Sequence, residues 1–180
     1  MRKEDRMAKP VKLAHVVFRT NQLETMVEWY CTVLEARVVH RGDGIVFLTY
    51  DDEHHRIALI GGQQHPEKPP GRPVGFVHVA FTYAGLPDLF GTYQRLKNAG
   101  ITPHRAINHG PTTSFYYRDP DGNDVELQVD RFADASDAMA WMQGEAFARN
   151  PIGVEFDAEQ MIARLQSGES HAALMRRPDE

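Results

Sequence analysis

An internal repeat constrains the fold of this chain more than any other feature. The segments "KLAHVVF" (residues 12–18) and "GFVHVAF" (residues 75–81) both place a histidine before valine, a further apolar residue and phenylalanine. After each copy come apolar residues at helical spacing and then three strand-like segments. The repeat therefore predicts two modules that share the element order β-α-β-β-β.

The helices and strands of each module can be placed from their patterns. Gly100 stands where a glycine commonly ends a helix, so the second helix is expected to stop there. The apolar faces of the two expected helices are Met26, Val27, Trp29, Tyr30, Val33 and Leu34, and Leu86, Leu89, Phe90, Tyr93 and Leu96. The expected strands after the helices cover residues 37–42, 44–50 and 55–62, and residues 102–107, 113–120 and 124–130.

These modules set the predicted domain organisation of an α+β protein. Residues 1–10 are expected to be a disordered lead, and residues 131–180 a helical C-terminal extension with helices over 136–151 and 157–169. The extension could pack on the sheet, act as a lid or make a subunit contact. The domain built from the modules covers residues 11–130: module 1 at 11–62, a Pro-rich linker at 63–73 and module 2 at 74–130.

Composition and charge exclude several classes of function. The 180 residues carry a formal net charge of −5 with dispersed basic residues, which argues against nucleic-acid binding. No stretch has the length of a transmembrane helix, and the charged N-terminal segment lacks the apolar run of a secretory signal. Cys31 is the single cysteine, so no intramolecular disulfide can form. We therefore expect a cytoplasmic protein without a membrane partner.

His15 and His78 occupy equivalent positions in the two copies. A lone histidine in a buried strand such as "FVHVAF" is usually satisfied by a neighbouring hydrogen-bond partner. Two histidines related by a repeat favour a shared role instead, because imidazole is a common ligand of first-row metals. The pair predicts a metal site.

Glu126 is the candidate carboxylate ligand. It alternates with Val125, Leu127 and Val129 in "DVELQV", where an ionised side chain is costly unless it is paired or binds a metal. The alternative is an outward, solvated side chain on a half-exposed strand. Aligning the repeats places Ala58 opposite Glu126, so the first module offers no carboxylate. Two histidines and one carboxylate with open positions are typical of non-haem Fe(II) oxygenases.

The paired "AHVVF" and "VHVAF" and the segment "RDPDGNDVEL" (residues 118–127) resemble the vicinal oxygen chelate superfamily, which includes glyoxalase I, bleomycin-resistance proteins and extradiol dioxygenases. The resemblance covers residues 11–130. It implies paired βαβββ modules that form an open curved mixed sheet around a metal. The closest likeness is to single-domain type I extradiol ring-cleaving dioxygenases, because glyoxalase-like members usually carry a fourth ligand where this chain has Ala58.

The resemblance also implies three catalytic residues. His55 in "HHRIAL" matches the catalytic histidine just before the small apolar residue, although it could be solvated in the acidic turn "DDEHH". Tyr116 matches a tyrosine ten residues before the carboxylate ligand, or it packs as one of two strand tyrosines. His109 is the candidate for a further histidine, at a spacing that differs from the larger two-domain enzymes.

The expected function is Fe(II)-dependent cleavage of a catechol-type ring, such as 2,3-dihydroxybiphenyl, with O2. His15, His78 and Glu126 would bind the metal, with Mn²⁺, Zn²⁺ and Ni²⁺ as alternatives to iron. The alternatives in function are a glyoxalase-like metal-dependent lyase or isomerase and a drug-binding resistance protein. A homo-oligomer, dimer or higher, is expected because the apolar tail needs burial.

Overall fold

A computed structural model describes residues 9–71 and 74–180 of the chain. Residues 1–8, most of the predicted lead, and residues 72–73 of the predicted linker lie outside the described residues. The chain divides into two compact units, one up to Pro69 and one from Pro70 onward. Residues 63–71 form no helix or strand.

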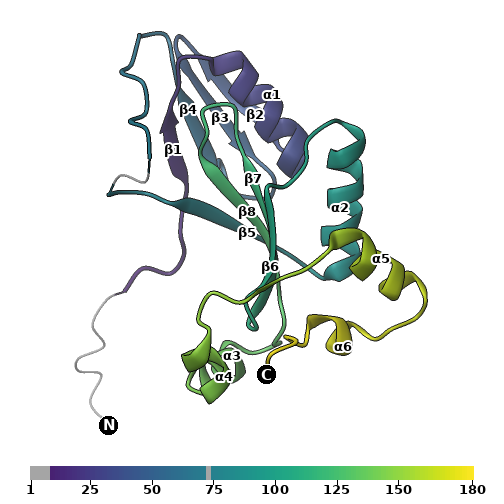
Figure 1. Ribbon diagram of the computed structural model, residues 1–180. Helices are drawn as coiled ribbons and strands as arrows, with labels where there is room; N and C mark the ends of the chain where they lie inside the picture. Colours follow the sequence, from purple (N-terminus) through teal and green to yellow (C-terminus); the bar gives the residue numbers. More distant parts are fainter. Residues whose placement is uncertain (1–8, 72–73) are drawn as a thin grey trace. The chain divides into compact units, whose positions relative to one another are not determined.

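The first unit is a four-stranded mixed sheet with one helix against a face of the sheet (Figure 1). The strand order is β1-β4-β3-β2, and β1 runs parallel to β4 while the other pairs are antiparallel. The elements are β1 (Val16–Arg19), α1 (Leu23–Leu34), β2 (Arg37–Gly42), β3 (Ile45–Thr49) and β4 (Ile57–Ile60).

Helix α1 forms where the apolar spacing predicts it. Its fully buried residues are Met26, Val27, Tyr30 and Val33, which lie on one face of the helix. Trp29 and Leu34, also expected on that face, are partly exposed at its margins.

The second unit repeats this arrangement and adds a strand. Its elements are β5 (His78–Tyr83), α2 (Leu86–Asn98), β6 (Arg105–Asn108), β7 (Thr112–Arg118) and β8 (Asp124–Asp130). The strand order is β5-β8-β7-β6-β9, in which β9 (Val154–Glu155) comes from the C-terminal extension and was not predicted. All five predicted apolar residues of α2 are buried, and Gly100 follows its end with φ +78°.

The strand registers of the two units are equivalent. In the first sheet Ala58 pairs with Val17 of β1, two residues after His15. In the second sheet Glu126 pairs with Ala80 of β5, two residues after His78. The repeat seen in the sequence is therefore a repeat of structure. The α+β class with two βαβββ modules is confirmed, as a four-stranded and a five-stranded mixed sheet.

The segment "FVHVAF" is not the buried strand that its apolar residues suggest. Strand β5 begins only at His78, and Phe76 and Val77 are 63% and 70% exposed. The physical reason is that β5 is the edge strand of the second sheet and pairs with β8 alone. The expectation of a fully buried strand at residues 76–81 was wrong.

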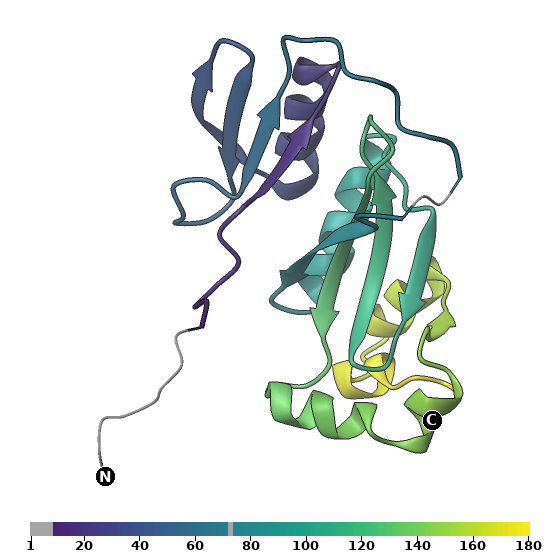
Figure 2. The same ribbon diagram turned by 90° about the vertical axis from the view of Figure 1, so that its left-hand side faces the viewer.

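The C-terminal extension packs on the second module. It contains α3 (Ala135–Met142), α4 (Glu145–Arg149), α5 (Ala158–Gln166) and α6 (His171–Met175). The helix expected over 136–151 is interrupted at Gly144, because glycine favours helix ends over interiors. Figure 2 shows α3, α4 and α6 at the end of the second sheet where β6 turns into β7. None of the helices in the described part of the chain is long and apolar enough to span a membrane.

Candidate active site

Two predicted ligands meet in the second unit. Strands β5 and β8 run parallel in a register that puts His78 and Glu126 on the same face of the sheet. The Nε2 atom of His78 lies 3.0 Å from Oε2 of Glu126. The parallel pairing of two neighbouring strands thus brings an imidazole and a carboxylate into contact.

Glu126 is 5% exposed, although it carries a carboxylate. The solvated side chain considered from the sequence is therefore excluded. A buried carboxylate needs a partner, and Glu126 has one in Nε2 of His78.

Tyr116 and His109 stand beside this pair. Tyr116 on β7 pairs in register with Glu126, and its hydroxyl oxygen lies 2.8 Å from Nε2 of His109. The hydroxyl is the donor, because Nδ1 of His109 is engaged by the backbone carbonyl of Ile152, which can only accept. Tyr116 is thus buried in the sheet and also makes a specific hydrogen bond to His109.

Burial and charge set the protonation of this group. Burial, with the Glu126 carboxylate second, raises the pKa of Tyr116 and keeps its phenol a hydrogen-bond donor at neutral pH. Burial also lowers the pKa of His109, against the hydrogen bond to Ile152 and the charge of Glu126, which raise it. A neutral tyrosine and a neutral histidine therefore face the carboxylate.

The first unit holds a second group of rings. His15, which directly precedes β1, lies with its ring centroid 4.4 Å from that of His55. Phe47 stacks on His55, with the two ring centroids 4.6 Å apart. Nδ1 of His54 lies 2.6 Å from Nδ1 of His55. Burial, and then the charges of His15 and His54, lower the pKa of His55. His55 thus contacts the rings of His15, Phe47 and His54 and is partly exposed.

The structure gathers the predicted residues into these two groups only. Within the part of the chain that the structure describes, no three His, Cys, Asp or Glu side chains form a group that could hold a metal ion. His78, Glu126, His109 and Tyr116 lie together in the second unit, and His15 and His55 in the first. The three-residue ligand set stays a prediction.

The donors of the second unit fit a divalent transition metal. Imidazole nitrogen and carboxylate oxygen are ordinary ligands of such ions. Two ligand atoms about 2.1 Å from one metal and at right angles to it are about 3 Å apart. The separation of His78 Nε2 and Glu126 Oε2, 3.0 Å, agrees with that value.

Several neighbours of the site were missed from the sequence. Arg105 pairs in register with Tyr116, and its guanidinium carbon lies 5.9 Å from the tyrosine ring centroid. His104 has Nε2 at 3.1 Å from Oδ1 of Asp124. The Ile152 carbonyl comes from a segment with no site motif. Arg105 could have been found only from the register of β6 and β7, which the sequence does not give.

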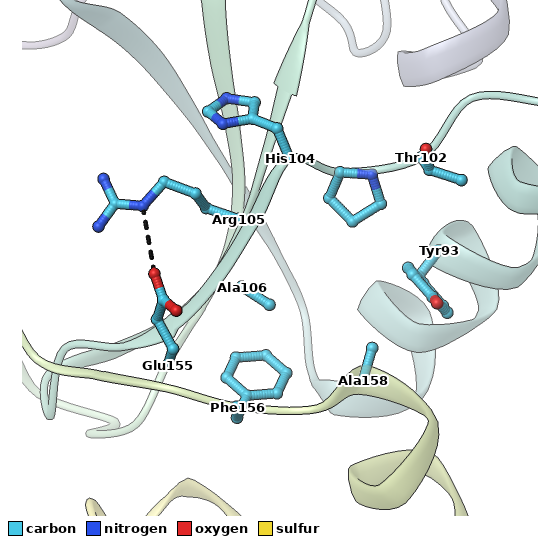
Figure 3. A pocket seen from close by; sticks show the side chains of 9 residues that line it. Tyr93, Thr102, His104, Arg105, Ala106, Glu155, Phe156 and Ala158 are labelled. Atoms are coloured by element: carbon cyan, nitrogen blue, oxygen red, sulfur yellow. Dashed lines mark ion pairs between the residues drawn. The ribbon is translucent and has the colours of Figure 1, made fainter.

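A pocket of about 300 Å³ lies elsewhere in the second unit, between α2, β6 and the segment that leads into α5 (Figure 3). Tyr93, Phe156 and Ala158 contribute to its wall, and Arg105 forms an ion pair with Glu155 at 3.7 Å. None of the six predicted site residues lines it. Two of its lining residues, His104 and Arg105, are the neighbours of the candidate active site named above.

Comparisons with known proteins agree with the fold and identify the family. A family model of the Glyoxalase/Bleomycin resistance protein/Dioxygenase superfamily matches residues 12–127. Biphenyl-2,3-diol 1,2-dioxygenase 2 of Rhodococcus globerulus is 47% identical over 87% of this chain and 83% of its own. Biphenyl-2,3-diol 1,2-dioxygenase 3 of the same organism is 44% identical over 92% of this chain and 88% of its own.

A solved structure supports the fold independently. The glyoxylase/bleomycin resistance protein/dioxygenase domain from Frankia sp. EAN1pec aligns with a TM-score of 0.55 at 21% identity, over 70% of this chain and 96% of that domain. The resemblance inferred from "AHVVF", "VHVAF" and "RDPDGNDVEL", with its likeness to extradiol dioxygenases, is confirmed. The chain belongs to the Glyoxalase/Bleomycin resistance protein/Dioxygenase superfamily.

Proposed function

We propose that this protein is an extradiol ring-cleaving dioxygenase that uses Fe(II) and O2 to open a catechol-type ring, with a 2,3-dihydroxybiphenyl-like diol as substrate. The observation that carries the proposal is the contact of His78 with the buried carboxylate of Glu126, with Tyr116 and His109 beside it. The names of the two Rhodococcus globerulus relatives, which match most of this chain, support the same activity and substrate class.

His78 and Glu126 supply two metal ligands in this proposal, and His15 supplies the third. When bound by two histidines and one carboxylate, Fe(II) keeps open positions and supplies the redox chemistry that joins O2 to a diol. Ala58, equivalent in register to Glu126, adds no further carboxylate. The ligand set then leaves room for both oxygens of a vicinal diol.

Three side chains handle protons and hydrogen bonds. Tyr116, whose raised pKa keeps its proton in place, donates a hydrogen bond to a diol oxygen. His109 accepts from Tyr116 in the absence of substrate and holds the hydroxyl in position. His55, whose lowered pKa leaves it neutral near pH 7, accepts a proton from the diol as substrate binds.

The two rivals differ in what they require of these residues. A glyoxalase-like lyase or isomerase would want a fourth protein ligand, and Ala58 is 3% exposed and cannot coordinate a metal. A drug-binding resistance protein has no need of a buried carboxylate held by a histidine. The pairing of His78 with Glu126 therefore favours the dioxygenase.

The test is a direct assay of the iron-loaded protein. Protein prepared without air and loaded with Fe(II) is mixed with 2,3-dihydroxybiphenyl, and then with a panel of catechols, in air. We expect a yellow ring-opened product and the uptake of one O2 for each diol consumed. The matched control is Glu126→Gln, which keeps the shape of the side chain and removes its charge.

Two results would contradict the proposal. One is no product across the diol panel when full iron occupancy has been measured. The other is turnover of the hemithioacetal of methylglyoxal and glutathione by the Zn²⁺- or Ni²⁺-loaded protein, together with no ring cleavage. The cellular metal and the predicted homo-oligomer stay open to measurement by metal analysis and by sedimentation.

A further inference from the structure

We propose that a turn of the C-terminal extension, residues 150–153, is a positioning element for His109. In this inference the backbone carbonyl of Ile152 fixes which ring nitrogen of His109 carries the proton. Asn150 and Arg177 hold that carbonyl in place. The consequence for catalysis rests on the proposed function, whereas the position of the proton does not.

The two ring nitrogens of His109 have different partners. Nδ1 is hydrogen-bonded to the Ile152 carbonyl, which has no hydrogen to give, so Nδ1 must be the donor. In a neutral imidazole Nε2 is then the acceptor, and it lies 2.8 Å from the Tyr116 hydroxyl. The hydrogen bond to Ile152 thus leaves the lone pair of Nε2 free to accept a hydrogen bond from the Tyr116 hydroxyl.

The side chain of Asn150 braces the turn. Its Oδ1 accepts hydrogen bonds from the backbone N–H groups of Ile152, at 3.2 Å, and Gly153, at 2.9 Å. Its Nδ2 donates to the carbonyl oxygen of Gly153 at 2.9 Å. An asparagine that binds the backbone two and three residues ahead fixes the path of a turn. The direction of the Ile152 carbonyl follows from this brace.

Close packing sets the turn against the end of strand β6, directly before and at His109. Gly153 has φ +107°, and a Cβ atom added there would lie 2.4 Å from the carbonyl oxygen of Asn108 and 2.7 Å from Cα of His109. Only glycine fits this approach. The next residue, Val154, pairs with Asn108 as β9 joins β6.

Arg177 ties the turn to the backbone of His109. Its side chain is fully buried, and one guanidinium nitrogen donates to the carbonyl oxygens of both His109, at 3.1 Å, and Asn150, at 2.7 Å. A second nitrogen donates to the Ala146 carbonyl at 2.6 Å, and Asp179 balances the charge. A buried guanidinium is tolerated only when its donors are satisfied. Here they are satisfied, and the acceptors link Asn150 of the turn to His109.

The first test reads the proton on His109 without metal or substrate. Protein labelled with ¹⁵N in its histidines is studied by long-range ¹H–¹⁵N NMR, with the His109 signals assigned by their loss in His109→Gln. We expect the Nδ1–H form in the natural protein. In Asn150→Ala we expect a change toward the Nε2–H form, and in Asn150→Ser, whose hydroxyl can still accept from the turn, a partial return.

Glu159→Ala is the matched control. Glu159 links the extension to Tyr93 and Lys97 of α2 and makes none of the hydrogen bonds that hold the turn, so this variant loosens a tail contact without touching the brace. It should keep the Nδ1–H form. Circular dichroism of each variant shows whether it is folded. An Nε2–H form in the natural protein, or an unchanged Nδ1–H form in folded Asn150→Ala, would overturn the inference.

The second test is kinetic and separates this inference from the proposed function. In the iron-loaded enzyme Asn150→Ala should lower kcat about tenfold, as loss of an outer partner does, with a smaller change in KM. Glu159→Ala should leave both unchanged. If the natural protein has the Nδ1–H form but cleaves no diol, the proposed function fails and the positioning stands. If ring cleavage is normal in folded Asn150→Ala, the positioning has no role in catalysis and the inference fails.

Discussion

Ala58 and Glu126 occupy the same position in two copies of one module. Each pairs with the residue that lies two places after the histidine of its repeat: Ala58 with Val17, and Glu126 with Ala80. The two copies therefore share a backbone frame, but only the second has a carboxylate at this position. A carboxylate at position 58 would add a fourth ligand to the three that we propose.

Ala58→Glu should suppress ring cleavage while it keeps or strengthens the binding of divalent metal. The new carboxylate would offer a fourth ligand and fill a position needed by the diol. Because Ala58 is 3% exposed, the metal-free variant should lose about 3 kcal/mol or more of its free energy of unfolding, as a buried unpaired charge does. Added Zn²⁺ should recover part of that loss in a thermal melt.

Ala58→Gln is the control for this variant, because it has nearly the same volume and no charge. It should be destabilised by its size but should show no recovery with Zn²⁺. Equal recovery in both variants, or full ring-cleaving activity in Ala58→Glu, would show that position 58 does not face the metal.

Glu126→Gln should weaken metal binding more than the roughly 10- to 100-fold that removal of an outer partner costs. The amide keeps the volume of the buried side chain but offers a neutral oxygen to the cation. Calorimetric titration of the metal-free protein with Co²⁺ measures the loss. Glu155→Gln, an exposed glutamate of the same unit, is the control and should bind as the natural protein does. Equal affinities in the two variants would remove Glu126 from the ligand set.

The repeat made most of the fold predictable. Helix α2 buries all five apolar residues expected of it, and strand β8 has the bounds that its alternation predicts. Gly144 shows where this reasoning ends, because its interruption of the tail helix depends on a local competition that an apolar pattern does not reveal. Strand β9 was missed for a related reason, since two residues are too few for a period.

The candidate site was predictable as far as the repeat and the resemblance reach. His78 and Glu126 were found from the sequence, and the structure places them in contact. The Ile152 carbonyl could not be found, because a backbone atom leaves no mark in composition. Arg105 was missed because its place beside Tyr116 follows from the register of β6 and β7, which the sequence alone does not give.

Tyr116→Phe should lower kcat about 10- to 100-fold with little effect on folding. The variant removes the hydroxyl that donates to His109 and, in the proposed reaction, to a diol oxygen. Steady-state kinetics with 2,3-dihydroxybiphenyl measure the change.

Tyr117→Phe is a matched control for it on the next residue of the same strand. Tyr117 projects to the opposite face of the sheet, is fully buried, and has a hydroxyl with no hydrogen-bond partner among the described residues. Its removal should leave kcat unchanged and raise the free energy of unfolding by about 1 kcal/mol, because an unsatisfied buried hydroxyl is costly. Equal losses of activity in the two variants would mean that the Tyr116 hydroxyl has no special role.

The docking of the extension should weaken as the solution becomes acidic, through Glu180. Burial alone would raise the pKa of this carboxyl, but its hydrogen bonds and charge pairing with Arg131 and the bond from Trp141 lower it below 4.5. A carboxyl with a depressed pKa in the folded state contributes stability above its unfolded pKa and loses it as pH falls through the folded value. The contribution should therefore be complete at pH 6 and fade below about pH 4.5.

Hydrogen exchange of α3 between pH 6 and pH 3.5, corrected for the intrinsic pH dependence of exchange, measures this effect. Protection in the natural protein should fall across that range, since Trp141 on α3 donates to Glu180. In Glu180→Gln the protection should already be reduced at pH 6 and should depend less on pH. Glu145→Gln is the control: this exposed residue pairs only weakly with Arg149, and its removal should leave the pH dependence intact. An unaltered pH dependence in Glu180→Gln would assign the acid sensitivity of the extension to another group.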